Sequence, residues 1–199
     1  MRFFRLFPTL AVVSIAACGG GESADSGDAP STDAEAAPEA AAPAMPSGPM
    51  TMPDWYAIDR DAETVNLTIT AGSVPDNNYW NYNGAINGSM AITVPEGYTV
   101  TITLVNEDPN MPHSVVISDE TEDFSAAPSP EPVFEGAATE NPTSMVDATM
   151  PGETETITFV AESAGNYSMV CTIPGHTALG MWIFFNVVPA DAEVGIQER

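Results

Sequence analysis

Apolar and polar residues alternate along most of the chain from residue 53 to residue 199. Residues 98–104 place tyrosine, valine, isoleucine and leucine at every second position, with threonines between them. This period of two predicts a half-buried β-strand, because successive side chains of a strand point to opposite faces of the sheet. The same alternation recurs at residues 65–70, 156–159 and 167–171.

Residues 182–188 follow a different pattern, because they are apolar on both faces apart from Asn186. Such a strand is buried on both sides, so we expect it at the centre of a sheet. Turn-forming residues separate the predicted strands at 83–84, 87–88, 95–97, 151–152 and 164–166. About seven short strands joined by turns predict an all-β fold, a Greek-key β-sandwich, for residues 53–199.

One long segment, residues 119–150, interrupts the spacing of the strands. It carries four prolines, many acidic residues and no basic residue. A connection of about 30 residues exceeds the usual length within one domain. We interpret the segment either as a lid or docking loop or as a solvated excursion without a role, since both fit an acidic, proline-rich insertion.

The first 17 residues have the features of a secretory signal peptide. Arg2 and Arg5 provide the cationic start, and a short apolar stretch follows up to Ala17. That stretch is shorter than the roughly 20 residues that a membrane-spanning helix needs. Residues 15–18, Ile-Ala-Ala-Cys, resemble the lipobox of bacterial lipoproteins, which implies that Cys18 is lipidated. An ordinary cleaved signal peptide is the alternative.

Residues 18–52 form a predicted linker. They are rich in alanine, proline, serine, glycine and acidic residues and contain almost no large apolar residue. Such a composition cannot bury a core, so we expect a disordered tether. With a lipid on Cys18, the linker would hold the domain of residues 53–199 to a membrane, at the periplasmic or extracytoplasmic face of the cell envelope.

The charge of the chain is strongly negative. It contains 4 basic residues, none of them lysine, against 28 acidic residues, for a formal net charge of −24. Nucleic acid is excluded as a partner, because its binding needs basic groups that displace phosphate counterions. The acidity indicates a docking surface for a cationic protein, an adaptation to a salty milieu, or both.

The clearest chemical signal is the spacing C-x4-H-x4-M, formed by Cys171, His176 and Met181 between two predicted strands. The end of the first strand fixes the cysteine, and the second strand begins at the methionine. The short Pro174-Gly175 turn brings the histidine back toward the same point. One loop can therefore supply three ligands to a metal ion.

His113 is the only other histidine of the chain, and it opens a further predicted strand. Two imidazoles, one thiolate and one thioether are the ligand set of a type 1 (blue) copper site. The sequence therefore predicts that His113 completes a mononuclear copper site with the three residues of the loop.

Other interpretations of these residues remain open. A buried cysteine usually packs as a small apolar residue, and a lone methionine is more often core than ligand. Cys171 and His176 also suit a nucleophilic pair, although no orienting third residue stands nearby in the sequence. A structural zinc site favours more cysteines or histidines. Copper nitrite reductases and multicopper oxidases need further histidine ligands, and a CuA centre needs a second cysteine where Gly175 stands, so we expect no enzymatic activity.

The loop and His113 resemble those of the cupredoxins. Residues 80–95, with their N-x-N-G and N-G turns, resemble the sulfocyanin family in particular, as does the Met181-Trp182 pair. Rusticyanin has the same loop spacing. The resemblance runs from about residue 55 to residue 188. It implies an eight-stranded cupredoxin fold and a one-electron carrier with one copper ion on His113, Cys171, His176 and Met181.

Ser114 departs from the commoner cupredoxin pattern, in which an asparagine follows the first histidine ligand and ties the two ligand strands together. A serine is also found in rusticyanin-like proteins. The departure puts the tie between the strands in question and suggests an elevated reduction potential, unless Ser114 only points into the edge of the sandwich.

These observations lead to one functional hypothesis and one alternative. The first is a monomeric, lipid-tethered electron shuttle between respiratory-chain components, with a c-type cytochrome and a terminal oxidase or reductase as partners. We expect electrons to leave through His176, which lies among apolar residues of the loop. The alternative is a periplasmic copper storage or delivery protein, whose bound metal would be colourless.

Overall fold

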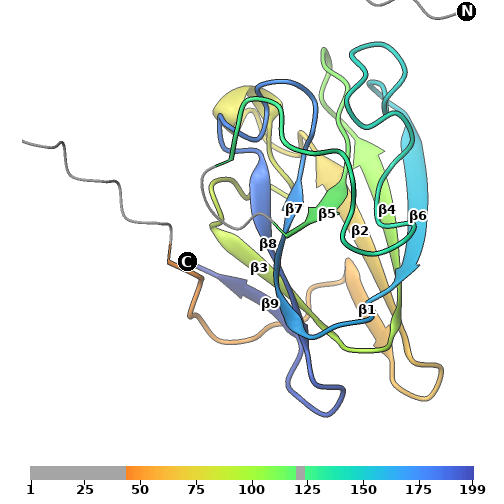
Figure 1. The fold of residues 1–199 in the computed structure, drawn as a ribbon. Helices are drawn as coiled ribbons and strands as arrows, with labels where there is room; N and C mark the ends of the chain where they lie inside the picture. The colour runs from red at the N-terminus through yellow and green to blue at the C-terminus, as the bar shows by residue number, and fades with distance from the viewer. Residues whose placement is uncertain (1–43, 120–123) are drawn as a thin grey trace, which may run out of the picture. The chain divides into compact units, whose positions relative to one another are not determined.

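The computed structural model describes residues 44–119 and 124–199 (Figure 1). The predicted signal peptide, the lipidation site Cys18 and residues 18–43 of the predicted linker lie outside the described residues. Within the described part of the chain, no helix is long and apolar enough to cross a membrane.

Two β-sheets form the domain (Figure 1). The four-stranded sheet has the order β1-β2-β4-β6, with β1 (Tyr56–Asp59), β2 (Thr64–Ala71), β4 (Thr99–Asn106) and β6 (Thr154–Val160). The five-stranded sheet has the order β5-β7-β8-β3-β9, with β3 (Met90–Pro95), β5 (Val116–Ser118), β7 (Gly165–Val170), β8 (Trp182–Val188) and β9 (Gly195–Glu198). A single tight turn, η1 (Asp76–Tyr79), follows β2. Each sheet is mixed, because β2 pairs with β4 in parallel and β3 pairs with β8 in parallel.

The predicted all-β sandwich is confirmed, and β8 lies at the middle of its sheet, as its two apolar faces indicated. The described residues contain nine strands rather than about seven. The strands β1 and β9 have four residues each, which is too short for alternation to reveal them.

The core lies between the two sheets. The alternating residues of β2 and β4 turn their apolar side chains inward, where Val65, Ile69 and Leu104 are fully buried. Their threonines face outward and pair across strands, with Oγ1 atoms 3.3 Å apart for Thr101 and Thr158. The period of two in the sequence thus separates core from solvent in this sheet.

The outer face of the five-stranded sheet is also covered. Trp182 and Phe184 of β8 are buried there with Val116 of β5. Phe124 packs on Trp182 with ring centroids 4.6 Å apart. This cover comes from the long segment that follows β5, and it explains why β8 is apolar on both faces.

The expectation of a solvated excursion is wrong for residues 133–139. Backbone hydrogen bonds fasten this stretch along β5, from Val133 N–H to the Ile117 oxygen and from Thr139 N–H to the Val115 oxygen, both 2.9 Å. Phe134 is 3% exposed and packs on the rings of neighbouring β6 and β7 residues. The acidic and proline-rich composition obscured this role, because only a few of its side chains turn inward.

Two residues of the predicted linker contact β9. Thr51 and Ile196 of β9 exchange two backbone hydrogen bonds of 2.9 and 2.8 Å. The side-chain amide of Gln197 donates to the Gly48 oxygen at 2.9 Å. Backbone pairing needs no apolar side chain, so composition could not reveal that Thr51 pairs with β9.

Replacement of Phe134 tests whether the long segment is part of the core. Phe134→Ala should lower the free energy of unfolding by about 3 kcal/mol or more, because it empties a buried aromatic site. The measurement is urea unfolding of the purified domain. Val146→Ala is the control, since Val146 is 72% exposed and should change stability by less than about 0.5 kcal/mol. Equal midpoints for the two variants would contradict a structural role for Phe134.

Candidate metal centre

Four buried residues from two parts of the chain meet at one end of the sandwich. Cys171 directly follows β7, Met181 directly precedes β8, and His176 lies in the loop between them. His113 precedes β5. All four are at most 1% exposed. The loop is closed by backbone hydrogen bonds from Cys171 N–H to the Met181 oxygen and from Met181 N–H to the His176 oxygen.

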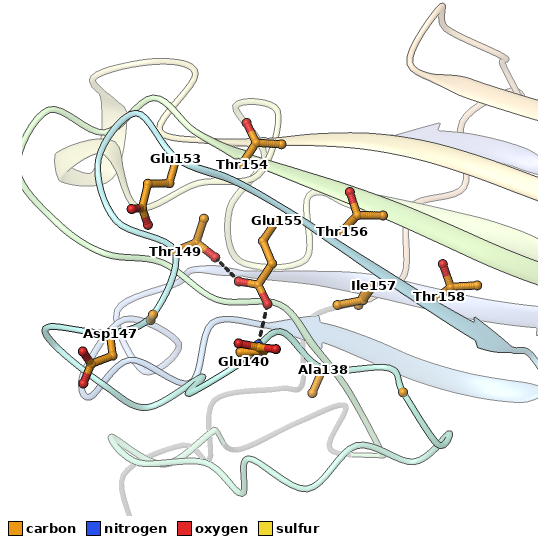
Figure 2. A pocket seen from close by; sticks show the side chains of 12 residues that line it. Ala138, Glu140, Asp147, Thr149, Glu153, Thr154, Glu155, Thr156, Ile157 and Thr158 are labelled. Carbon is orange, nitrogen blue, oxygen red and sulfur yellow. Dashed lines mark hydrogen bonds between the residues drawn. The ribbon is translucent and has the colours of Figure 1, made fainter.

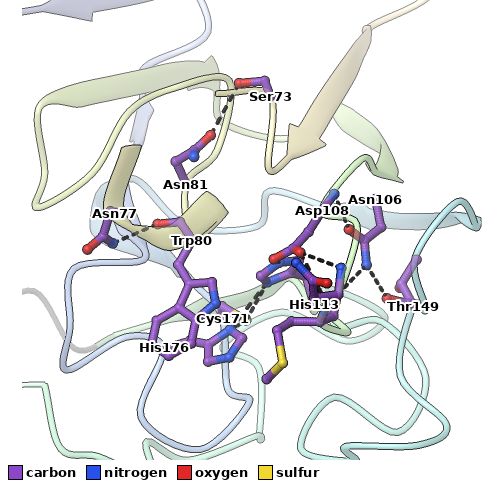
Figure 3. A network of polar contacts seen from close by, with 12 residues as sticks. Ser73, Asn77, Trp80, Asn81, Asn106, Asp108, His113, Thr149, Cys171 and His176 are labelled. Carbon is purple, nitrogen blue, oxygen red and sulfur yellow. Dashed lines mark hydrogen bonds and ion pairs between the residues drawn. The ribbon is translucent and has the colours of Figure 1, made fainter. Parts of the chain in front are cut away.

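Three donor atoms form a compact triangle (Figure 3). The Nδ1 atoms of His113 and His176 are 3.3 Å apart, and Cys171 Sγ lies 3.8 and 3.5 Å from them. A point equidistant from the three atoms lies about 2 Å from each, which is the length of a metal–imidazole bond. Two imidazoles and one thiol, with a thioether carried by the adjoining Met181, fit a single copper ion. The sequence-predicted ligand residues therefore come together in the fold.

Asp108 sets the orientation of His113. The Nε2 atom of His113 is 2.9 Å from the Asp108 carboxylate, and both side chains are almost fully buried. The other carboxylate oxygen accepts the N–H groups of Asn110 and Met111. Because Nε2–H donates to the carboxylate, Nδ1 keeps its lone pair directed at the site. Sequence reasoning missed Asp108, although an acid five residues before a candidate ligand was the available signal.

Burial controls the protonation of the donors. It lowers the pKa of His113, against the opposing effect of Asp108. Burial, with the nearby His113, lowers the pKa of His176 to about 3. Both imidazoles are thus neutral and able to bind a metal near neutral pH. Burial also raises the pKa of the Cys171 thiol, although hydrogen bonds from Ile173 and Ser114 oppose the rise. A metal ion would supply the charge that keeps this sulfur deprotonated.

Ser114 ties the two ligand-bearing segments together, which resolves the question raised by its sequence. Its Oγ accepts the Thr172 N–H at 3.0 Å and lies 3.7 Å from Cys171 Sγ, to which it donates. The Ser114 carbonyl oxygen accepts the hydroxyl of the fully buried Tyr82. A serine therefore joins the histidine segment to the cysteine segment, as the commoner asparagine would be expected to do.

The loop at Pro174 and Gly175 turns as its sequence indicated. Gly175 has a φ of +89°, a conformation that side chains disfavour. Its N–H donates to the Ala126 oxygen at 2.6 Å, and the Thr172 hydroxyl donates to the Pro142 oxygen at 2.8 Å. The long segment after β5 therefore supports the ligand loop directly.

His176, the expected electron exit, is only 1% exposed. The indole of Trp80 covers it, with ring centroids 3.9 Å apart and planes 17° from parallel (Figure 3). The sequence pointed to residues 80–95 only as a family resemblance, and nothing in it placed Trp80 on a ligand. Leu179, in contrast, is 60% exposed beside the loop.

Removal of the serine hydroxyl tests the tie between the ligand segments. Ser114→Ala should destabilise the metal-free protein by about 1–3 kcal/mol, because it leaves the buried Thr172 N–H without its acceptor. Urea unfolding measures the effect. Ser168→Ala is a matched control, because Ser168 is equally buried and its Oγ has no hydrogen-bond partner among the described residues. Equal stabilities of the two variants would rule out the tie.

The chain is similar to several known proteins. The model of the sulfocyanin (SoxE) domain family matches residues 55–192, which include all four candidate ligands. Sulfocyanin from Sulfolobus acidocaldarius is 34% identical over 125 residues, which are 60% of this chain and 61% of the relative, less than two thirds of its length. Among solved structures, reduced auracyanin from Roseiflexus castenholzii is 29% identical, with 61% of this chain and 95% of that chain covered and a TM-score of 0.43. Rusticyanin from Thiobacillus ferrooxidans is 23% identical, with 68% and 87% covered and a TM-score of 0.45. On the family match, which spans well over half of its residues, the chain belongs to the sulfocyanin domain family.

Proposed function

We propose that this protein is a one-electron carrier that binds one type 1 copper ion through His113, Cys171, His176 and Met181. The observation that carries the proposal is the triangle of two imidazole nitrogens and one sulfur within 4.8 Å, buried from solvent. Copper bound there supplies a one-electron couple. The residues of the chain hold the donors in place.

The surroundings of the donors favour a carrier, because they resist movement. Asp108 fixes the ring of His113, and Ser114 fixes the position of the cysteine segment. The strands that adjoin these two segments, β5 and β7, pair with each other in the five-stranded sheet. Donors that keep one arrangement need little reorganisation when a single charge is gained or lost, which supports rapid electron transfer.

One groove among the described residues does not contain the site. Its volume is about 840 Å³, and it is lined by side chains from residues 136–158, including Glu140, Glu153 and Glu155 (Figure 2). The Glu155 carboxylate is occupied by the Thr149 hydroxyl and the Glu140 N–H. None of the four candidate ligands lines this groove.

Burial of the donors also favours a carrier over copper storage or delivery. A delivery site must pass its metal to a partner, which exposed ligands allow. Here His113 and Cys171 are fully buried, and His176 lies under an indole ring. Metal exchange would require this end of the sandwich to open.

We also propose that the carrier is tethered to a membrane at the extracytoplasmic face of the cell envelope. The support is the signal-like residues 1–17, the lipobox-like sequence ending at Cys18, and the linker composition that follows. A lipid on Cys18 would anchor the domain through this linker.

The proposed partners are a c-type cytochrome and a terminal oxidase or reductase, each met by a monomeric carrier. The acidic surface supports cationic partners. The guanidinium of Arg60 donates to the Ala190 and Ala192 oxygens, and that of Arg199 donates to the Ala44 oxygen. In the described residues, neither arginine forms an ion pair with a carboxylate, and an uncompensated negative surface steers cationic partners.

Loading the protein with copper tests the main proposal. The copper-loaded protein should show an intense visible band and a reversible one-electron reduction. Cys171→Ser should lose the band while the sandwich stays folded, because the band arises from charge transfer between the cysteine sulfur and copper. Met181→Leu is the control and should keep the band, since the cysteine is intact. A wild-type protein that binds copper without colour would instead support storage or delivery.

Cell fractionation tests the tether. Cys18→Ser should move the protein from the membrane fraction to the soluble fraction, because lipid can no longer be attached. Ser14→Ala is the control, since it changes the signal-like segment but keeps the cysteine, and it should leave the protein with the membranes. A Cys18→Ser protein that stays with membranes would refute the lipid anchor.

A further inference from the structure

Trp80 is placed against His176 by a strained piece of backbone. Asn77, Asn78 and Tyr79 have φ values of +52°, +58° and +66°, three consecutive residues in the left-handed region. Residues with a side chain rarely adopt this conformation in succession, because the Cβ atom crowds the backbone. Strain of this kind persists only where surrounding contacts enforce it, and it is concentrated at functional sites.

Hydrogen bonds from two asparagines enforce this conformation. Asn77 receives the Trp80 N–H on its backbone oxygen, and its side-chain amide donates back to the Trp80 oxygen at 2.9 Å. Asn81 is fully buried, and its amide nitrogen donates to the Val74 and Asp76 oxygens. The loop between β2 and β3 is thus built to hold the residue between these asparagines in one position.

The contact between Trp80 and His176 is a face-to-face stack. The centroids are 3.9 Å apart and the planes differ by 17°. Among the described residues, the aromatic rings in contact with His176 are those of Trp80 and His113. His113 is itself one of the candidate ligands. The Trp80 ring is therefore the aromatic group that connects His176 with the surface.

The direct route from His176 is closed. Its side chain is 1% exposed, and its Nε2 atom has no hydrogen-bond partner among the described residues. The ring therefore offers neither an exposed edge nor a hydrogen bond to a docked protein. Trp80 is half-buried, so it both touches the ligand ring and reaches the surface.

We infer that Trp80 is the relay through which the electron passes between His176 and a docked redox protein. The inference rests on the proposed copper-binding function. One electron leaves the reduced site and one electron arrives at the acceptor, which is a c-type haem or a second, oxidised copy of this protein. No bond forms or breaks and no proton moves. Trp80 acts as the medium between the two sites and is not itself oxidised.

Electron self-exchange of the copper-loaded protein is the sharpest test, because donor and acceptor are the same protein. The reaction has no driving force, so a change of reduction potential in a variant cannot alter its rate through the equilibrium. NMR line broadening in mixtures of oxidised and reduced protein measures the rate. Molar salt screens the repulsion between two acidic copies.

The variants distinguish the effect of the aromatic ring on the exchange rate from the effect of side-chain size. Trp80→Leu keeps an apolar cover but removes the ring, and it should slow self-exchange several-fold. Trp80→Phe keeps a stacking ring and should retain most of the rate. Trp55→Leu is the matched control, because Trp55 is also half-buried against the core but makes no ring contact with His176 among the described residues. If Trp80→Leu does not fold, Trp80→Met replaces it.

Each result has a defined meaning. Unchanged exchange in Trp80→Leu would overturn the relay. Equal slowing in Trp80→Leu and Trp80→Phe would show that Trp80 acts only through packing, and it would overturn the relay. Equal slowing in Trp55→Leu would have the same meaning. A wild-type protein without colour or exchange would instead refute the proposed function on which the relay rests.

A second readout uses the metal-free protein. The chain has two histidines, so modification by diethyl pyrocarbonate can be assigned by mass spectrometry. In the wild type both imidazoles should react slowly, because both are buried. Trp80→Ala should expose His176 alone to rapid modification, and Trp55→Ala should expose neither. Rapid modification of His176 in the wild type would show that Trp80 does not cover the ring and would overturn the inference.

Discussion

The pairing of β7 with β8 is the constraint on which the metal centre depends. Its register sets Val170 opposite Trp182, and one further backbone bond joins Cys171 to Met181. The cysteine and methionine therefore face each other across the hairpin, and the loop between them has room to return His176 to the same place. A slip of one residue would turn every side chain of either strand to the opposite face, so the buried faces of β8 also protect the site.

The remaining donor reaches the hairpin through a separate set of polar contacts. His113 arrives from the four-stranded sheet after β4, and Asp108 fixes its ring while Ser114 binds the segment of Cys171. Each of these groups is buried, so each unmade hydrogen bond would be costly. The metal centre therefore depends on the segment that connects the two sheets as well as on the loop between β7 and β8.

The composition of the long segment after β5 does not reveal that part of it packs against the core. Its prolines and carboxylates resemble those of a solvated loop, yet Phe134 fills the core and backbone hydrogen bonds fasten the segment to β5. The same segment covers Trp182 and supports the ligand loop at Gly175. These contacts depend on a few inward side chains and on backbone pairing. Neither produces a regular pattern of apolar residues in the sequence.

The sequence by itself determined the sandwich, its central strand and the four candidate ligands. Alternation follows directly from strand geometry, and the C-x4-H-x4-M spacing follows from a loop between paired strands, so both are local properties of the chain. The partners of those ligands were decided by tertiary structure. Asp108 and Trp80 lie in loops outside the predicted strands, and only the meeting of distant segments brings a carboxylate to His113 and an indole to His176. Contacts of that kind depend on how the sheets are stacked, which no pattern along one strand encodes.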